Sequence, residues 1–137
     1  HAFTRRIRGL VPYTVACNTS FQGLIGDAAK NAGYLISREC YKVKGSPLYG
    51  SRPVNFIHDQ FLLEVPEAHG HEAVMRLAEL MVEGALPFLP DVPPTVKQPM
   101  LARCWSKDAQ QVWSNGRLIP WEFDFIVKKR ESRKLVG

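Results

Sequence analysis

A histidine and an aspartate stand side by side between two short apolar segments, and this pair is the best candidate for chemistry. His58 and Asp59, with Gln60, join residues 54–57 to 61–65, and both segments predict strands. Mg²⁺ usually takes one or two protein carboxylates and fills its other positions with phosphate oxygens and water. Two such ions can clamp the entering and leaving oxygens of an in-line phosphoryl transfer. We therefore interpret Asp59 as a magnesium ligand on a rigid mount, although an aspartate in a turn commonly serves the turn alone.

The histidines also suggest two weaker alternatives to a magnesium site. His69 and His71 lie near an expected helix start, but nothing supplies the third ligand that a zinc site needs, so solvent-facing side chains are the simpler interpretation. The pair His58-Asp59 is also found in metal-dependent phosphohydrolases of the HD type, which carry it on helices. No nucleophile with a neighbouring base and no glycine-rich phosphate loop can be identified.

A second candidate surface is a stripe of polar and small residues on an expected helix. Its members follow one another at steps of three and four: Asn18, Gln22, Gly26, Ala29 or Lys30, and Gly33. Each glycine costs a helix about 1 kcal/mol relative to alanine, so two on one side need a reason. Close packing of another element is one reason. A nucleic-acid backbone running over the helix start, with Asn18 and Gln22 as hydrogen-bonding groups, is the other.

These residues require a helix and a hairpin to position them. Apolar spacing predicts a helix over 19–41, begun by a cap at Asn18, Thr19 or Ser20. The two strands beside His58 and Asp59 are apolar enough to be largely buried. The apolar side of the helix is expected to hold Phe21, Leu24, Ile25, Ala28, Leu35 and Ile36.

Further elements are expected towards the C-terminus. A second helix is predicted over 67–86, followed by a proline-rich bridge over 87–99, a possible strand over 96–103 and a hairpin over 112–119. The buried side of the second helix should hold Val74, Leu77, Ala78, Met81 and Ala85, and its solvent side Glu72, Arg76, Glu79 and Glu83.

Composition limits the classes of protein to consider. The chain has 137 residues, 45% of them hydrophobic, and a formal net charge of +5, which suits one globular domain with a mild preference for a polyanion. No apolar run is long enough to span a membrane, and the first residues do not resemble a signal peptide.

Three cysteines without CxxC spacing favour a reducing compartment over a disulfide framework. Basic residues cluster at both ends: Arg5, Arg6 and Arg8, then Lys128, Lys129, Arg130, Arg133 and Lys134.

Two motifs together resemble the C-terminal palm of family A DNA polymerases, the DNA polymerase I family. ACNTSFQGLIGDAAK over 16–30 resembles the family's N-x-x-x-Q-G helix with its A-D-x-x-K continuation, and FIHDQFLLEVP over 56–66 resembles its V-H-D-E hairpin. The resemblance covers about 16–121, and the tail around 105–107 and 118–121 is most like phage-type members. It implies an α+β fold in which a hairpin carrying the catalytic aspartate packs against a long helix and a second helix. A small C-terminal hairpin would complete the domain.

The resemblance also implies roles for individual residues. Asp59 matches the catalytic, metal-binding aspartate, and His58 matches the histidine beside the primer terminus. Gln22 and Asn18 match residues whose side chains contact the primer–template duplex. Two positions depart from the family. Gln60 stands where a glutamate is usual, which puts a charged role there in doubt. Thr14 stands where many members have an arginine for the template strand, and Arg5, Arg6 or Arg8 could replace that phosphate contact.

The resemblance implies an incomplete enzyme. The family's second metal aspartate and its nucleotide-binding fingers are missing, so we expect 1–15 to be a basic segment that follows the fingers, 16–121 the palm part and 122–137 a basic, partly disordered tail. The chain would supply one catalytic aspartate and duplex contacts to a DNA-templated DNA polymerase that uses two Mg²⁺ ions. Its partners would be primer–template DNA, a dNTP and an N-terminal remainder, with no membrane, in the cytoplasm of a bacterial host or phage-infected cell. The alternative is a non-catalytic basic DNA-binding module derived from a polymerase.

Overall fold

The computed structural model describes residues 7, 9–92, 94–97, 99–102, 104–106 and 109. Within them the chain has an α+β fold made of two α-helices and one two-stranded antiparallel hairpin. The elements follow in the order α1 (Tyr13–Lys42), β1 (Arg52–Ile57), β2 (Gln60–Glu64) and α2 (Gly70–Ala85). Short 3₁₀ turns, Glu67–His69 and Leu86–Phe88, flank α2. The coarse fold class predicted from the sequence is therefore confirmed.

Helix α1 begins six residues before the predicted start. Its N-cap is Pro12, no side chain caps it, and the expected cap at Asn18, Thr19 or Ser20 is wrong. Proline has no backbone N–H and is tolerated only around the first turn of a helix, so Pro12 marks the start. The Thr19 hydroxyl instead donates to the carbonyl of Val15, 2.6 Å away, which is a bond made within the helix.

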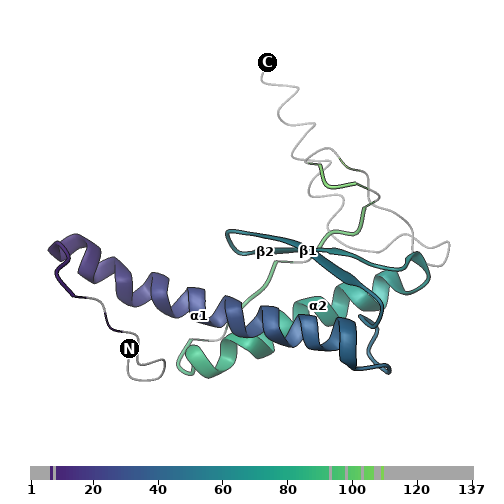
Figure 1. The fold of residues 1–137 in the computed structure, drawn as a ribbon, viewed down its shortest axis with the longest axis horizontal. Helices are drawn as coiled ribbons and strands as arrows, with labels where there is room; N and C mark the ends of the chain where they lie inside the picture. The colour runs from purple at the N-terminus through teal and green to yellow at the C-terminus, as the bar shows by residue number, and fades with distance from the viewer. Residues whose placement is uncertain are drawn as a thin grey trace, which may run out of the picture.

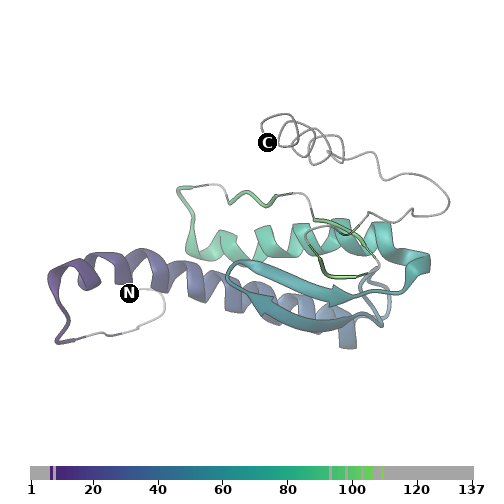
Figure 2. The ribbon, with the colours of Figure 1, turned by 90° about the horizontal axis from the view of Figure 1, so that it is seen from above.

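The two helices run antiparallel and touch at their backbones (Figures 1 and 2). A Cβ placed on Gly84 would lie 2.5 Å from the Ala32 Cα, so only glycine allows this approach. The Asn31 side chain donates to the Gly84 carbonyl at 2.9 Å. The buried residues of α1 nearest this crossing, Ala28 and Ala32, are accordingly small, and the others are Gly23, Ile36 and Cys40.

The predicted apolar side of α1 is wrong in part. Ala28 and Ile36 are buried as expected, but Phe21 is 72% exposed and Ile25 is also exposed. The first turns of α1 extend beyond the ends of α2 and the hairpin, so no described element covers these side chains (Figure 1). On α2, Val74 and Leu77 are buried as predicted, while Ala78, Met81 and Ala85 are half-buried and Leu80 is fully buried.

A tight connection carries the chain from α1 into the hairpin. The Ser46 hydroxyl donates to the Glu39 carboxylate at 2.6 Å and accepts the Leu48 N–H at 3.1 Å. Gly50, at φ 87°, donates its N–H to the Cys40 carbonyl at 3.0 Å. A positive φ is readily adopted only by glycine, so this residue directs β1 back along α1.

The hairpin forms where it was predicted, but its strands are less buried than expected. Register pairs include Phe56 with Phe61 and Ile57 with Gln60, and an irregularity falls between Pro53 and Asn55. Proline cannot donate to a ladder and is common beside such irregularities. Most of β1 is exposed, including Val54 at 54%.

One hydrophobic core joins the C-terminal half of α1, the hairpin and α2. Its buried members are Ile36, Cys40, Leu48, Ala73, Leu77 and Leu80, with Phe61, Leu63 and Val65 packed against them. Over the described residues of 94–97 and 99–102 no strand forms, and only Ala102 makes an isolated bridge, so the strand expected at 96–103 is not seen there. The hairpin expected at 112–119 and the basic tail at 122–137 lie outside the described residues.

Candidate functional site

The predicted metal-binding pair occupies the tip of the hairpin. His58 and Asp59 are the two residues of the turn between β1 and β2, and both are exposed, as is Gln60 at the start of β2. His58 has a φ of 55°, a conformation that few residues other than glycine adopt. A two-residue turn joining paired strands leaves its backbone little freedom, so the main chain of Asp59 is held in place and its side chain is exposed to solvent.

Aromatic packing sets the height of this tip above α1. A Cβ on Gly33 would lie 3.2 Å from the ring of Phe61, so the ring rests on the bare backbone of the helix. Phe56, opposite Phe61 in the ladder, stacks on it with ring centroids 4.5 Å apart. Close packing therefore explains Gly33. It does not explain Gly26, which has open space where a Cβ would be.

Asn18 and Gln22 lie on the same side of α1 as the hairpin. Their spacing to Gly33, through Gly26 and Ala29, follows the three- and four-residue steps of one helix face, and Gly33 is the point where the hairpin rests. Both side chains are exposed. In both views the hairpin turn points towards the N-terminal half of α1 (Figures 1 and 2).

The tip and the two polar side chains are aligned without touching. The turn lies about 7 Å beyond Phe61 along the strand, at the usual rise of a β-strand. Gln22 lies about 16 Å from Gly33 along the helix, at 1.5 Å per residue. The hairpin tip therefore reaches only part of the way from Gly33 to Gln22, and Gly26, which has open space at the position of its Cβ, lies in this interval.

The turn offers one exposed carboxylate, that of Asp59, as a potential metal ligand. A single exposed carboxylate is what Mg²⁺ takes from a protein when phosphate oxygens and water complete its coordination. Among the described residues, no three His, Cys, Asp or Glu side chains gather closely enough to hold a metal ion by themselves. His69 is exposed and His71 is half-buried, and the pair His58-Asp59 stands on a turn instead of the helices that HD-type enzymes use.

Sequence reasoning missed the residue that positions the tip. The sequence predicts Phe61 only as part of a strand, and its contact with Gly33 of α1 depends on the tertiary structure. The signal was the second glycine of the stripe, since a bare helix position opposite an aromatic strand residue indicates close packing. The predicted DNA contacts Arg5, Arg6 and Arg8 lie outside the described residues.

No protein-family model, curated protein or solved structure matches the chain. Neither described helix combines the length and apolar character needed to cross a bilayer.

Proposed function

We propose that the chain is the C-terminal palm part of a family A-like DNA polymerase. The observation that carries this proposal is the exposed side chain of Asp59 in the turn of an antiparallel hairpin that points towards the N-terminal half of the long helix α1 (Figure 1). The proposal also draws on the resemblance of 16–30 and 56–66 to the two motifs of that family. The basic character of the chain, at +5, suits a DNA partner.

In this proposal the chain's own residues bind and position. Asn18 and Gln22 donate hydrogen bonds to the primer–template backbone, which passes close to the helix at Gly26 because no side chain stands there. His58 contacts the primer terminus, and Asp59 would hold Mg²⁺. The metal, when bound, would supply charge neutralisation as the primer 3′-hydroxyl attacks the α-phosphate of a dNTP, which forms the new P–O bond while pyrophosphate leaves. Gln60 keeps a polar side chain at the tip without a second charge.

The second metal carboxylate and the dNTP-binding groups would come from an N-terminal partner piece. The chain with that piece should extend a primed template in the presence of Mg²⁺, whereas the chain alone should not. Asp59→Asn should lower the rate of the complex by several orders of magnitude, because the lost stabilisation acts chiefly in the transition state. His58→Ala should cost less. Full activity in the Asp59→Asn complex, or synthesis by the lone chain, would contradict the proposal.

A non-catalytic DNA-binding module is the second candidate. It needs no metal site, and it rests on the net charge of +5 and on the exposed polar side chains of Asn18 and Gln22. Magnesium separates the two candidates. If the chain only binds DNA, Asp59→Asn should leave duplex binding as tight or tighter, because the change removes negative charge near phosphate. The same substitution should then abolish no Mg²⁺-dependent activity. Asn18→Ala and Gln22→Ala should weaken duplex binding in either case while leaving the fold intact.

A further inference from the structure

Helix α1 carries a second exposed surface that the proposed palm role does not use. Tyr34, Arg38 and Tyr41 follow at steps of four and three, which places them on one side of the C-terminal half of α1. Tyr34 is 64% exposed and Tyr41 is 56% exposed, and Arg38 is exposed as well. Gly33, one residue before Tyr34 and therefore about 100° away around the helix, faces the hairpin. The tyrosines thus lie beside the duplex-facing stripe and not within it.

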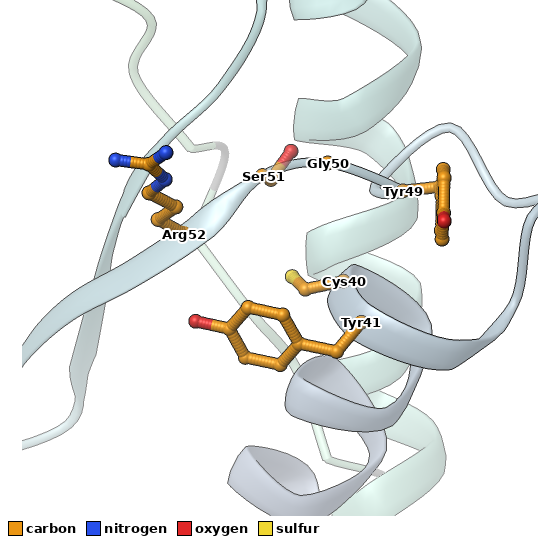
Figure 3. Close-up of a pocket in the computed structure, with 6 residues that line it drawn as sticks. All are labelled: Cys40, Tyr41, Tyr49, Gly50, Ser51 and Arg52. Atoms are coloured by element: carbon orange, nitrogen blue, oxygen red, sulfur yellow. The ribbon is translucent and has the colours of Figure 1, made fainter.

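Arg52 extends this surface onto the hairpin. An open pocket of about 270 Å³ between the end of α1 and the start of β1 is lined by Tyr41 and Arg52, together with Cys40, Tyr49, Gly50 and Ser51. Figure 3 shows the Tyr41 hydroxyl and the Arg52 guanidinium directed to the same side. We call Tyr34, Arg38, Tyr41 and Arg52 the tyrosine–arginine face.

The two arginines of this face form no ion pair within the described part of the chain, although, after the Arg76 hydrogen bond, the charge of Arg38 also helps to lower the pKa of Glu39. Glu64, opposite Arg52 in the ladder, does not bridge to it. Glu39, the acidic neighbour of Arg38, is bound by Arg76 instead. Lys42 and Lys44, both exposed, add positive charge beside Tyr41.

Exposed aromatic rings between unpaired cations are the chemistry that binds single-stranded nucleic acid. Bases stack on the rings, and the cations contact the phosphates. Tyr34 and Tyr41 are separated by about 10 Å along the helix, which is three times the 3.4 Å spacing of bases in a duplex strand. The two rings are therefore far enough apart to stack on two different bases of one strand. The pocket beside Tyr41 is smaller than the usual 300–1,000 Å³ of a small-molecule site, and it suits one base.

We propose that the tyrosine–arginine face binds single-stranded nucleic acid. This binding is separate from the duplex contacts of the proposed polymerase role, because it uses neither Asp59 nor the stripe of Asn18 and Gln22. It would hold for a DNA-binding module as well as for a polymerase part.

Fluorescence anisotropy of the full chain with labelled 20-nucleotide oligo(dT) and oligo(rU) tests the proposal. Tyr34→Ala and Tyr41→Ala should each weaken binding of the preferred oligonucleotide about fivefold or more, since stacking is lost. Phenylalanine at either position should retain binding within about twofold, because its ring still stacks. Tyr13→Ala is the matched control, since Tyr13 is an exposed tyrosine at the other end of α1, and it should have little effect.

The charged members have their own controls. Arg38→Ala and Arg52→Ala should each reduce the slope of log affinity against log salt concentration by about 0.7, as expected for one phosphate contact to a single strand. Lys97→Ala removes the same charge from an exposed position outside the face and should leave the slope unchanged. An abasic 20-mer with the same phosphates should bind more weakly and should not respond to Tyr34→Ala or Tyr41→Ala.

Several results would overturn the proposal. These are no binding of either oligonucleotide, equal losses in the face variants and their controls, or binding of the abasic strand as tight as that of oligo(dT). Circular dichroism of every variant checks that the fold is kept. Asn18→Ala and Gln22→Ala should weaken duplex binding and leave oligo(dT) binding unchanged, so failure of this proposal can be told from failure of the proposed function.

Discussion

The two halves of α1 belong to one continuous helix but differ in how far their side chains are buried. From Ala28 to Cys40 the helix is packed: glycine and alanine meet at the crossing with α2, and Ile36 is fully buried. From Tyr13 to Gln22 nearly every side chain is exposed, large apolar ones included. Since helix stability in proteins comes mostly from the packing of a buried face, the packed half contributes most to the stability of the fold, and the exposed half contributes little.

Alanine at Gly84 should have a large effect and would disrupt the packing of the two helices. Its Cβ would meet the Ala32 backbone at 2.5 Å, where nothing flexible can move aside. We expect a loss of about 3 kcal/mol in the free energy of unfolding, even though alanine favours helix formation.

The matched control is alanine at Gly26, which has open space around the position of its Cβ. It should stabilise the protein by up to about 1 kcal/mol. Urea denaturation of both variants measures the difference, and equal effects would show that the crossing is not close-packed.

Each half of α1 holds one cysteine, so the reactivities of the two thiols provide a direct comparison of the halves. Burial raises the pKa of the Cys40 thiol to about 11, whereas Cys17 is exposed. Cys40 in the folded protein should react with a thiol reagent about 100-fold or more slowly than Cys17, because reaction requires the thiolate and access to it.

Stability should also fall in alkali because of Cys40. Between pH 9 and 11 the unfolded chain releases this proton while the folded chain retains it, so unfolding is favoured as pH rises. The expected loss over that interval is roughly 2–3 kcal/mol, from 1.36 kcal/mol for each pKa unit. Cys40→Ala should flatten this alkaline decline in a pH series of denaturant melts. A decline that persists unchanged would assign it to another group.

Replacing Arg76 tests the ion pair that connects α2 to the packed half of α1. Predicted to face water, it is half-buried and binds Glu39 at 2.6 Å, Glu83 at 2.8 Å and Glu79 at 2.9 Å. Arg76→Ala should cost about 1–2 kcal/mol, since it leaves the partly buried Glu39 without its counter-ion. Glu72→Gln, at an exposed position on the same helix, should change little.

The same pair predicts behaviour in acid. The hydrogen bond from Arg76, followed by that from Ser46 and opposed by burial, holds the pKa of Glu39 below its ordinary 4.5. The folded chain therefore binds fewer protons than the unfolded chain near that pH. The contribution of Glu39 to stability is present above pH 4.5 and is lost as pH falls through the lowered pKa. In Arg76→Ala this acid dependence should shrink, as melts between pH 3 and 6 would measure.

The smallest expected effect belongs to the exposed half. Phe21→Ser should change the free energy of unfolding by less than about 0.5 kcal/mol, because the ring is 72% exposed and has little packing to lose. Ile36→Ala in the packed half should cost about 2–5 kcal/mol. A large loss in Phe21→Ser would show that the exposed half is also packed in solution.

Much of the architecture was predictable because it depends on local patterns. The hairpin around His58 and Asp59 follows from two short apolar segments around a polar turn, and α2 from its apolar spacing. The exposed placement of Asp59, Asn18 and Gln22 follows from the same patterns. Their chemical roles remain predictions.

Tertiary structure alone decided which surfaces meet. Phe21 and Ile25 are as apolar as Ile36, but α2 and the hairpin cover only the later turns of α1. Hydrophobic spacing identifies a helix face without giving its partner, so it could not show that Ala32 and Gly84 touch or that Arg76 turns inward to Glu39. The sequence by itself determined the elements and the turn that carries Asp59. Their relative positions depended on contacts between residues far apart in the chain, which no local pattern records.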